Sequence, residues 1–507
     1  MTAAGGAAAE KGGKRGEWRI ACWLAAVAAL AYLPFDHCHF SGTDEMGVFE
    51  PAEALYLRGD LAVEEGKHRF PGRDGRIYSH FAIGQSILVV PFLAVGDALG
   101  RWLPDPLVRA VVGREQEGRI LDTLETPAIA AATFYAPLVS GLLVALFYLF
   151  ERGLGATRRS ALIAAGLLGA TTYVACHAVF FLRHTTEALA VLGSFAALHT
   201  WRRGGRLRWL AIGSLCASLL VLIRVPAVVA GPALAGYLLW TLRERARRED
   251  APPWPRMLAA AALPALAIAA IHMGVNFLKW GTWIASPMLA QSPLLRGSLL
   301  QGLHGLLLSP GASVFVYSPL LLLLPLTLPD FARRQRAECV TAVAIVASFL
   351  ALCGPFLFWH GLWSSPGPRY LFVATPLLML PLGPWLDGAR RAWQWLLLAG
   401  LALAGLVVQI GLLAAHWRRT VVLMGYQDEI ATVPFLFDAA RSPIVGCLRS
   451  LAAGEIDVYL WALWHGVPGR APQPGATVFL LSLWALAMGL AIRGLCRALG
   501  RGRLVAP

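Results

Sequence analysis

Charged residues are scarce in this 507-residue chain. Asp, Glu, Lys and Arg make up 15% of it, whereas a soluble domain of this size carries about 25%. Hydrophobic residues make up 57%, and the mean hydropathy is +0.59. The apolar residues gather in runs of roughly twenty, the length that crosses a bilayer. The composition therefore predicts a polytopic membrane protein and excludes a single soluble globular domain.

Several motifs of soluble enzymes are also missing. None of the eight cysteines forms a CxxC pair, which argues against a zinc or redox motif. The sequence has no Walker-type phosphate loop and no internal repeat. The predicted inner loops are too short to hold a nucleotide-binding domain. Any chemistry must therefore come from the membrane bundle and its outer loops.

We predict an all-α membrane protein of about twelve transmembrane helices. Its long first extracytoplasmic loop, residues 34–127, carries interfacial helices. The predicted spans have ends that are uncertain by a few residues, and they are 18–33, 128–150, 161–182, 185–200, 209–223, 227–240, 257–277, 314–328, 339–359, 370–386, 393–415 and 477–492.

One further apolar run, residues 81–99, is nearly long enough to span. If it crossed the membrane, four Arg-rich loops would lie outside, against the positive-inside rule. If it lies along the outer interface, those loops face inward. We therefore predict an interfacial helix, and the inner side then carries 25 basic and 9 acidic residues. Orientation accounts for the net charge of +14, so no nucleic-acid partner is needed.

The same topology divides the chain into four parts. Residues 1–17 are Ala-, Gly- and Lys-rich, and we expect them to form a disordered cytoplasmic N-terminus. Residues 18–415 form the bundle with its first outer loop, 416–476 form another outer loop, and 477–507 hold the last span and a cytoplasmic tail. Eleven of the twelve histidines fall outside or near outer helix ends, which favours a functional outer face.

Carboxylates open the first outer loop, at Asp36 and then at Asp44 and Glu45. A carboxylate just past the first span, near the membrane surface, can act as a general base on an acceptor hydroxyl. The alternative is a solvated acidic loop. Farther along, Asp74-Gly75 predicts a turn that would hold Tyr78 and His80 near the membrane surface.

Cations lie at several outer helix ends and could clamp a phosphate through their forked donors. The alternative for each is simple interfacial anchoring. Glu187 could pair with Arg183 at i and i+4, or it could position a substrate or a metal together with His184. The cations are Arg183, Arg224, Lys279, Arg296 and Arg369.

This organisation resembles the GT-C glycosyltransferase superfamily, which includes protein O-mannosyltransferases and the lipid A aminoarabinose transferase. The architecture match covers nearly the whole chain. Three short stretches look like those of uncharacterised bacterial members of this group. As motifs they are of moderate specificity. They are DGRIYS at 74–79 leading to GQS at 84–86 and Pro91, LSPG at 308–311 followed by YSP at 317–319, and WSSPGPRY at 363–370.

The resemblance implies roles for individual residues. Asp44 takes the position of the catalytic aspartate with Glu45 beside it, and Asp36 is the second choice because it lies nearer the first span. Arg369 fits a basic residue that faces the carrier phosphate, with Arg183 or Arg224 assisting. Tyr78, His80, His184 and Glu187 would position the substrate. The Lys-Pro-Pro or His-Pro-Pro signature of the mannosyltransferases is absent, and 79–82 (SHFA) stands near its place.

The implied reaction is transfer of a sugar from a polyprenyl-phosphate donor to an extracytoplasmic acceptor, with inversion at the anomeric carbon. The expected location is a bacterial inner membrane with the site facing the periplasm. A divalent metal, Mg²⁺ or Mn²⁺, could assist but no motif requires one. The alternatives are a transporter or flippase of lipid-linked or polar solutes and a non-catalytic scaffold. A transporter usually shows repeats and midplane charges, which this sequence lacks.

Overall fold

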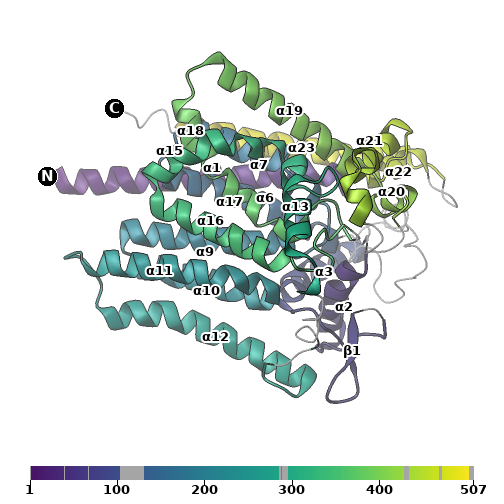
Figure 1. Cartoon of the computed structure of the whole chain (residues 1–507), viewed down its shortest axis with the longest axis horizontal. Helices are drawn as coiled ribbons and strands as arrows, with labels where there is room; N and C mark the ends of the chain where they lie inside the picture. Colours follow the sequence, from purple (N-terminus) through teal and green to yellow (C-terminus); the bar gives the residue numbers. More distant parts are fainter. Residues whose placement is uncertain are drawn as a thin grey trace.

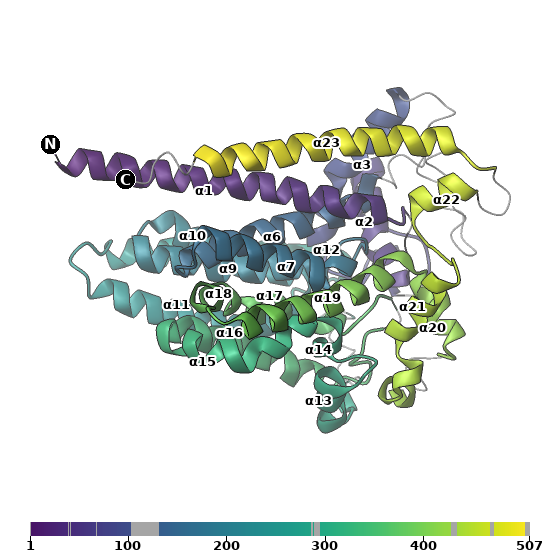
Figure 2. The same ribbon diagram turned by 90° about the horizontal axis from the view of Figure 1, so that it is seen from above.

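The computed structural model describes residues 2–38, 40, 42–66, 68–102, 131–284, 287, 295–362, 364–426, 433–466 and 471–501. Long helices run side by side along one axis, and both termini lie at one end of the bundle (Figures 1 and 2). Short helices and a hairpin gather at the opposite end. We call the end with the termini the inner end and the other the outer end, following the charge distribution; the orientation itself stays a prediction.

Within these described residues, seven segments are long and apolar enough to cross a membrane. Each coincides with a predicted span, and their long uninterrupted apolar stretches explain why they form continuous helices. The helices that carry these segments are α1 (Thr2–Tyr32), α6 (Tyr135–Gly153), α11 (Gly231–Ala246) preceded by the 3₁₀ turn η2 (Val225–Ala230), α12 (Trp254–Trp280), α16 (Arg336–Cys353), α19 (Ala392–Ala414) and α23 (Pro474–Arg501).

The other five predicted spans are shorter, more polar or broken. Proline interrupts two of them, because it removes a backbone donor and clashes with the preceding turn. The helices are α7 (Arg158–Thr171) with α8 (Val174–His177), α9 (His184–Gly204), α10 (Leu207–Ile223), α14 (Val314–Tyr317) with η4 (Pro319–Leu323) and α15 (Leu324–Arg334), and η5 (Arg369–Leu371) with α17 (Ala374–Met379) and α18 (Leu382–Gly388). The predicted all-α polytopic architecture is confirmed.

The outer end is built from short elements. A two-stranded antiparallel hairpin pairs Arg69 with Ser79 and Pro71 with Ile77. The elements are η1 (Leu33–Phe35), α2 (Thr43–Arg58), β1 (Arg69–Pro71), β2 (Ile77–Ser79), α3 (Gly84–Trp102), α13 (Leu299–Leu308), α20 (Trp417–Leu423), η6 (Val433–Phe437), η7 (Ala439–Arg441), α21 (Pro443–Ala452) and α22 (Tyr459–His465).

Helix α3 contains the apolar run whose placement the sequence left open. Both views place it at the outer end, next to α2, rather than along the bundle (Figures 1 and 2). Its first residue, Gly84, lies against the α10 backbone, where an added Cβ would come within 2.6 Å of the Leu222 carbonyl oxygen. This close approach fixes the start of α3 beside α10 and supports the interfacial interpretation.

Helix α1 begins at Thr2, whereas the first predicted span begins at residue 18. The expected disorder of residues 1–17 stays a prediction. Residues 103–130, the rest of the first outer loop, lie outside the described residues.

Candidate active site

Asp44 lies in the first turn of α2, at the outer end of the bundle. Its carboxylate forms an ion pair with Arg369, with 2.8 Å between Nη1 and Oδ2. The Ser364 hydroxyl donates to the same oxygen at 3.2 Å, and His68 Nε2 lies 3.5 Å from Oδ1. The side chain keeps 17% of its surface exposed, so a small group can still reach it.

Glu45 has a different role from its neighbour. One of its carboxylate oxygens accepts from the Gly42 backbone N–H at 3.1 Å, which caps the start of α2. The other accepts from the Phe181 backbone N–H at 2.7 Å. Glu45 therefore ties α2 to the segment before α9 and holds Asp44 in place.

Asp36 is also engaged with backbone. Its carboxylate accepts from the Cys38 N–H at 2.7 Å, and its carbonyl accepts from the Tyr459 N–H at 3.1 Å. These contacts fix the exit of the first span and the start of α22. Of the three predicted catalytic carboxylates, Asp44 is the one that the structure places against Arg369.

Arg369 lies at the end of a tight loop that follows α16. Gly361 takes a left-handed φ of +63°, and a Cβ there would come within 2.8 Å of the Arg369 Cγ, so glycine is required for the arginine to lie where it does. The guanidinium also donates to the Tyr370 hydroxyl at 3.1 Å. Arg369 is 5% exposed. Trp363, the first residue of the WSSPGPRY stretch that contains Arg369, lies outside the described residues.

A second ion pair lies beside the first. Arg224, at the end of α10, donates to both oxygens of Glu187 at 3.2 Å, and His184 Nδ1 lies 3.4 Å from Glu187. The sequence suggested Arg183 as the partner of Glu187. Arg183 is the N-cap of α9, and its carbonyl accepts from the Glu187 backbone N–H at 2.9 Å, so the i, i+4 turn forms. Its guanidinium, however, stacks on the Phe81 ring at 4.0 Å, and Arg224 bonds the Glu187 carboxylate.

Tyr370 joins the two ion pairs. The guanidinium carbons of Arg224 and Arg369 lie 5.1 Å and 5.0 Å from its ring centroid, a distance at which cation–π attraction operates. Arg183 interacts electrostatically with both carboxylates, Asp44 and Glu187. We define the site cluster as Asp44, Glu187, Arg183, Arg224 and Arg369. It contains three arginines and two carboxylates, and this excess of positive charge favours an additional anion.

The local charges fix protonation states. Burial raises the pKa of the Asp44 carboxyl, but the charges of Arg369, His68 and Arg183 and the Ser364 hydrogen bond together outweigh it and lower that pKa to about 2. Burial lowers the pKa of His80 to about 3, with the nearby charges of His68 and Arg183 adding to the effect. At neutral pH Asp44 is therefore a carboxylate and His80 is neutral.

Three site residues were not assigned from the sequence. Ser364 and Tyr370 lie inside the quoted WSSPGPRY stretch but received no role. His68 adopts a left-handed φ of +67°, an uncommon conformation for a residue with a side chain, and it brings its ring to Asp44. A lone histidine in a polar loop carries no sequence signal for this placement.

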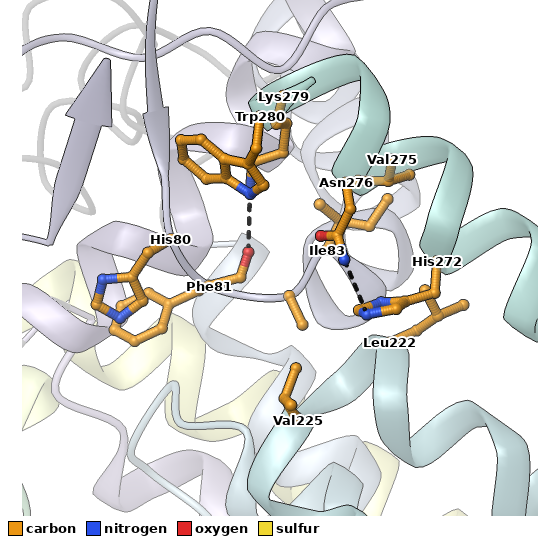
Figure 3. Close-up of a pocket in the computed structure, with 11 residues that line it drawn as sticks. His80, Phe81, Ile83, Leu222, Val225, His272, Val275, Asn276, Lys279 and Trp280 are labelled. Carbon is orange, nitrogen blue, oxygen red and sulfur yellow. Dashed lines mark hydrogen bonds between the residues drawn. The ribbon is translucent and has the colours of Figure 1, made fainter. Parts of the chain in front are cut away.

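Tyr78 lies within the hairpin strand β2, and His80 directly follows that strand. The Tyr78 hydroxyl donates to Asp74 at 2.8 Å and its ring packs against Trp280, so Tyr78 supports the hairpin. The His80 ring lies between those of His68 and Phe81, at centroid distances of 5.1 and 4.2 Å. Figure 3 shows His80 and Phe81 on one wall of a cleft whose opposite wall is α12.

The described residues do not assemble a metal site. No three His, Cys, Asp or Glu side chains among them converge on one point. In the site cluster, His68 lies 3.5 Å from one Asp44 oxygen, but Arg369 and Ser364 occupy the other oxygen. The donor set does not fit a divalent ion in this arrangement.

No family model and no curated protein matches the chain. Among solved structures, ArnT from Cupriavidus metallidurans bound to undecaprenyl phosphate is 17% identical over 94% of this chain and 76% of that chain, with a TM-score of 0.48. The apo form of that protein gives 14% identity, 87% and 78% coverage and a TM-score of 0.49.

An oligosaccharyltransferase from Archaeoglobus fulgidus, in its apo form, is 13% identical over 86% of this chain and 64% of that chain, with a TM-score of 0.43. These alignments extend over most of this chain. Similarity of this degree assigns no activity.

Proposed function

We propose that the chain is a membrane glycosyltransferase that moves a sugar from a polyprenyl-phosphate donor to an extracytoplasmic acceptor. The observation that carries the proposal is the Asp44–Arg369 ion pair, set within a buried cluster that holds one more cation than carboxylates. A carboxylate for the acceptor hydroxyl and a surplus of arginine for a phosphate are the two requirements of this reaction.

In the proposed step, Asp44 accepts the proton of the acceptor hydroxyl. The hydroxyl oxygen then forms a bond to the anomeric carbon of the donor sugar, and the bond from that carbon to the phosphate oxygen breaks. The phosphate leaves with the bonding electron pair, and direct displacement inverts the anomeric carbon. Preorganised donors aimed at developing charge often contribute more to such catalysis than any other effect. Arg369, Arg224 and Arg183 would supply them.

Arg369 would bind two anions in turn, first the Asp44 carboxylate and then the donor phosphate. Before the donor arrives it holds Asp44 in the ionised form at a low pKa, which makes the carboxylate a weak base. When the donor phosphate draws the guanidinium toward itself, the pKa of Asp44 rises and the carboxylate becomes a better proton acceptor. Donor binding would therefore prepare the base for the acceptor.

The remaining predicted residues have supporting parts in this proposal. Glu187 and His184 orient Arg224, and Glu45 orients the first turn of α2. Tyr78 supports the hairpin, and His80 shapes the wall beside Asp44. No step uses a metal. The bacterial inner membrane and a periplasmic site are part of the proposal, in line with the basic inner loops.

The test uses purified protein in lipid with a panel of polyprenyl-phosphate sugars and a cell-envelope extract as acceptor. We expect wild type to release free polyprenyl phosphate and Asp44→Asn to release it at least about a hundredfold more slowly, within the range for loss of a general base. Asp60→Asn is the matched control, because Asp60 is a carboxylate of the same outer loop that pairs with the exposed Arg58 and Arg76.

Three other outcomes would count against parts of the proposal. Equal release by wild type and Asp44→Asn would move the base elsewhere, with Asp36→Asn the next variant. Loss of release in Asp60→Asn as well would show that the effect is not specific to Asp44. No release from any donor by a folded protein would favour the transporter or scaffold alternatives.

A further inference from the structure

The loop from Ser364 to Arg369 supplies both side chains that contact Oδ2 of the Asp44 carboxylate. It follows α16 and ends at the short η5 turn, so no long helix and no strand holds it. The positions of Ser364 and Arg369 therefore depend on what fixes the loop backbone. Side chains from two other parts of the chain do so, and none of them belongs to the site cluster.

The segment between α7 and α9 bonds two carbonyl groups of this loop. His177 Nε2 lies 3.2 Å from the Pro366 carbonyl oxygen, and the Tyr173 hydroxyl donates to the Pro368 carbonyl at 3.3 Å. A carbonyl oxygen can only accept, so His177 carries a hydrogen on Nε2. The two bonds lie one residue before and one residue after Gly367, and together they fix the loop on one side.

Tyr317 confines the loop between those two bonds. Its ring lies against Gly367, which has a left-handed φ of +72°, and a Cβ added there would come within 3.0 Å of the ring. The Tyr317 hydroxyl donates to the Gly311 carbonyl at 3.1 Å, and the Tyr317 carbonyl accepts from Gln409 at 2.9 Å. Gly311 and Tyr317 belong to the LSPG and YSP stretches of the sequence. Those two stretches therefore support the third, which carries Arg369.

Tyr173, His177 and Tyr317, which we call the support cluster, pack against one another. The Tyr173 ring centroid lies 5.4 Å from that of His177 and 6.5 Å from that of Tyr317. The Tyr173 backbone N–H also donates to the Ser318 hydroxyl at 3.2 Å. All three residues of the cluster are 0% exposed. Close-packed interiors resist displacement, so the cluster is a firm base for a loop that has little structure of its own.

His177 is a costly residue at this position if its only task is packing. Its Nδ1 is buried and has no hydrogen-bond partner among the described residues, and a buried polar atom without a partner destabilises a fold. A phenylalanine ring would fill a similar space without that cost. The nitrogen that does form a bond, Nε2, is the one that holds the loop. The imidazole therefore contributes more to the position of the loop than to stability.

We propose that His177 and Tyr173 are positioning residues, which set Arg369 and Ser364 against Asp44 through the backbone of the loop that carries them. They bond Pro366 and Pro368 and act on Asp44 only through the loop. The expected effect on the rate rests on the proposed function. The placement of Arg369 beside Asp44 does not, because it exists before any donor binds.

The first test compares Tyr173→Phe and His177→Phe with wild type, as full chains reconstituted in lipid. Each variant removes one donor to the loop and keeps an aromatic ring. We expect kcat for release of polyprenyl phosphate, per folded molecule, to fall about tenfold in each, since small displacements of a positioned group cost rate. Tyr32→Phe is the matched control, because the buried Tyr32 hydroxyl donates to the Gly169 carbonyl of α7 at 2.8 Å. It should turn over as wild type does.

The second test follows the Asp44 carboxyl itself and needs no turnover. The groups that act on its pKa are Arg369, His68, Arg183 and Ser364, and the loop carries Arg369 and Ser364. Infrared spectra, with Asp44→Asn to identify the band, follow its protonation from about pH 2 to about pH 6. The pKa should rise by about one pH unit in Tyr173→Phe and His177→Phe, because the cation moves away. It should not change in Tyr32→Phe.

A lower unfolding midpoint with unchanged turnover and an unchanged pKa of Asp44 would make the support cluster purely structural and overturn the inference. His177→Gln keeps an N–H donor and should lose less turnover than His177→Phe; an equal loss would count against the bond to Pro366. Should His177→Phe fail to fold, Tyr173→Phe, which removes a single oxygen atom, decides the matter.

The two readouts separate this inference from the proposed function. If no chain transfers sugar but the pKa of Asp44 rises in both variants, the positioning role stands and the transferase is lost. If wild type transfers sugar and both variants match it in turnover and in the pKa of Asp44, the transferase stands and the positioning role is lost.

Discussion

Two ionic networks, each built around a buried carboxylate, lie at opposite ends of the bundle. At the inner end, Glu338 lies 2.9 Å from the His199 ring nitrogen and accepts from Tyr237 and Arg202, each at 2.7 Å. Arg202 also donates to Glu244 at 2.8 Å, and Arg248 donates to Glu244 at 3.2 Å. This network contains two arginines and two glutamates, so its formal charges balance before the histidine is counted.

The site cluster at the outer end lacks that balance. Its three arginines face two carboxylates, and Lys279 lies nearby without a carboxylate partner among the described residues. Burial of charge is unfavourable unless it is compensated. The comparison teaches that burial and ion pairing alone do not mark a functional site. An uncompensated excess of one sign does, because a ligand can complete it.

The largest expected difference between the two networks is in turnover. Arg369→Gln should lower the rate of sugar transfer about a hundredfold or more, since it removes a donor aimed at the leaving phosphate. Arg202→Gln should leave the rate per folded molecule within about twofold of wild type, although it lowers stability. Release of polyprenyl phosphate, divided by the folded fraction, checks both. Comparable loss of turnover in the two variants would remove the distinction between the networks.

The next effect is on stability and should be larger at the inner end. Glu338→Gln leaves Arg202 and His199 without their shared carboxylate, and breaking a buried pair typically costs about 3–5 kcal/mol. We expect a clear fall in the thermal unfolding midpoint in detergent. Glu244→Gln is the milder control, because Glu244 is 32% exposed against 1% for Glu338. An unchanged thermal unfolding midpoint in Glu338→Gln would show that this network does not stabilise the fold.

The sequence predicted the bundle better than the site. Long apolar runs give spans directly, and the basic loops decided the interfacial position of α3. Asp44 and Arg369 were chosen through the family resemblance, and the structure brings them together. The contact of Ser364 with Asp44 joins residues 320 positions apart, and no local pattern encodes such a distance.

The failures also have physical causes. Spacing alone did not identify the side chain that bonds Glu187. Arg183 lies one helical turn before it, as the i, i+4 spacing predicts, but the guanidinium that bonds the carboxylate is that of Arg224, at the end of another helix. The role of His68 depends on a left-handed backbone and a hairpin, which the sequence around it does not indicate.

A third difference concerns pH. Arg369 lowers the pKa of Asp44 to about 2, so the stability that this carboxylate contributes is present above about pH 4 and is lost as the pH falls through about 2. For the same reason kcat/KM of wild type should show no acid limb from Asp44 above about pH 4. In Arg369→Gln, burial should raise the pKa of Asp44. The acid limb of the kcat/KM profile should then move up by about one to three pH units.

Arg369→Lys keeps the positive charge and provides the control for that profile. Its acid limb should stay near that of wild type even if its rate is low, because lysine lacks the forked donors but still favours the ionised carboxylate. Profiles of kcat/KM from about pH 3 to about pH 8 for the three proteins decide the matter. Identical limbs in wild type and Arg369→Gln would show that the guanidinium does not set the protonation of Asp44.

The smallest difference is expected at two glycines that support one arginine each. Gly361 has a φ of +63° and lies against Arg369; Gly205 has a φ of +65°, and an added Cβ there would come within 1.7 Å of Arg245. Replacing either by alanine should cost about 1 kcal/mol in backbone conformation alone. Only Gly361→Ala should also lower turnover, by about three- to tenfold, because the displaced arginine is the one beside Asp44. Gly205→Ala should lower the unfolding midpoint and leave turnover per folded molecule unchanged. If both variants lost stability and neither lost turnover, the position of Arg369 would tolerate displacement, and its part in binding the phosphate would need another explanation.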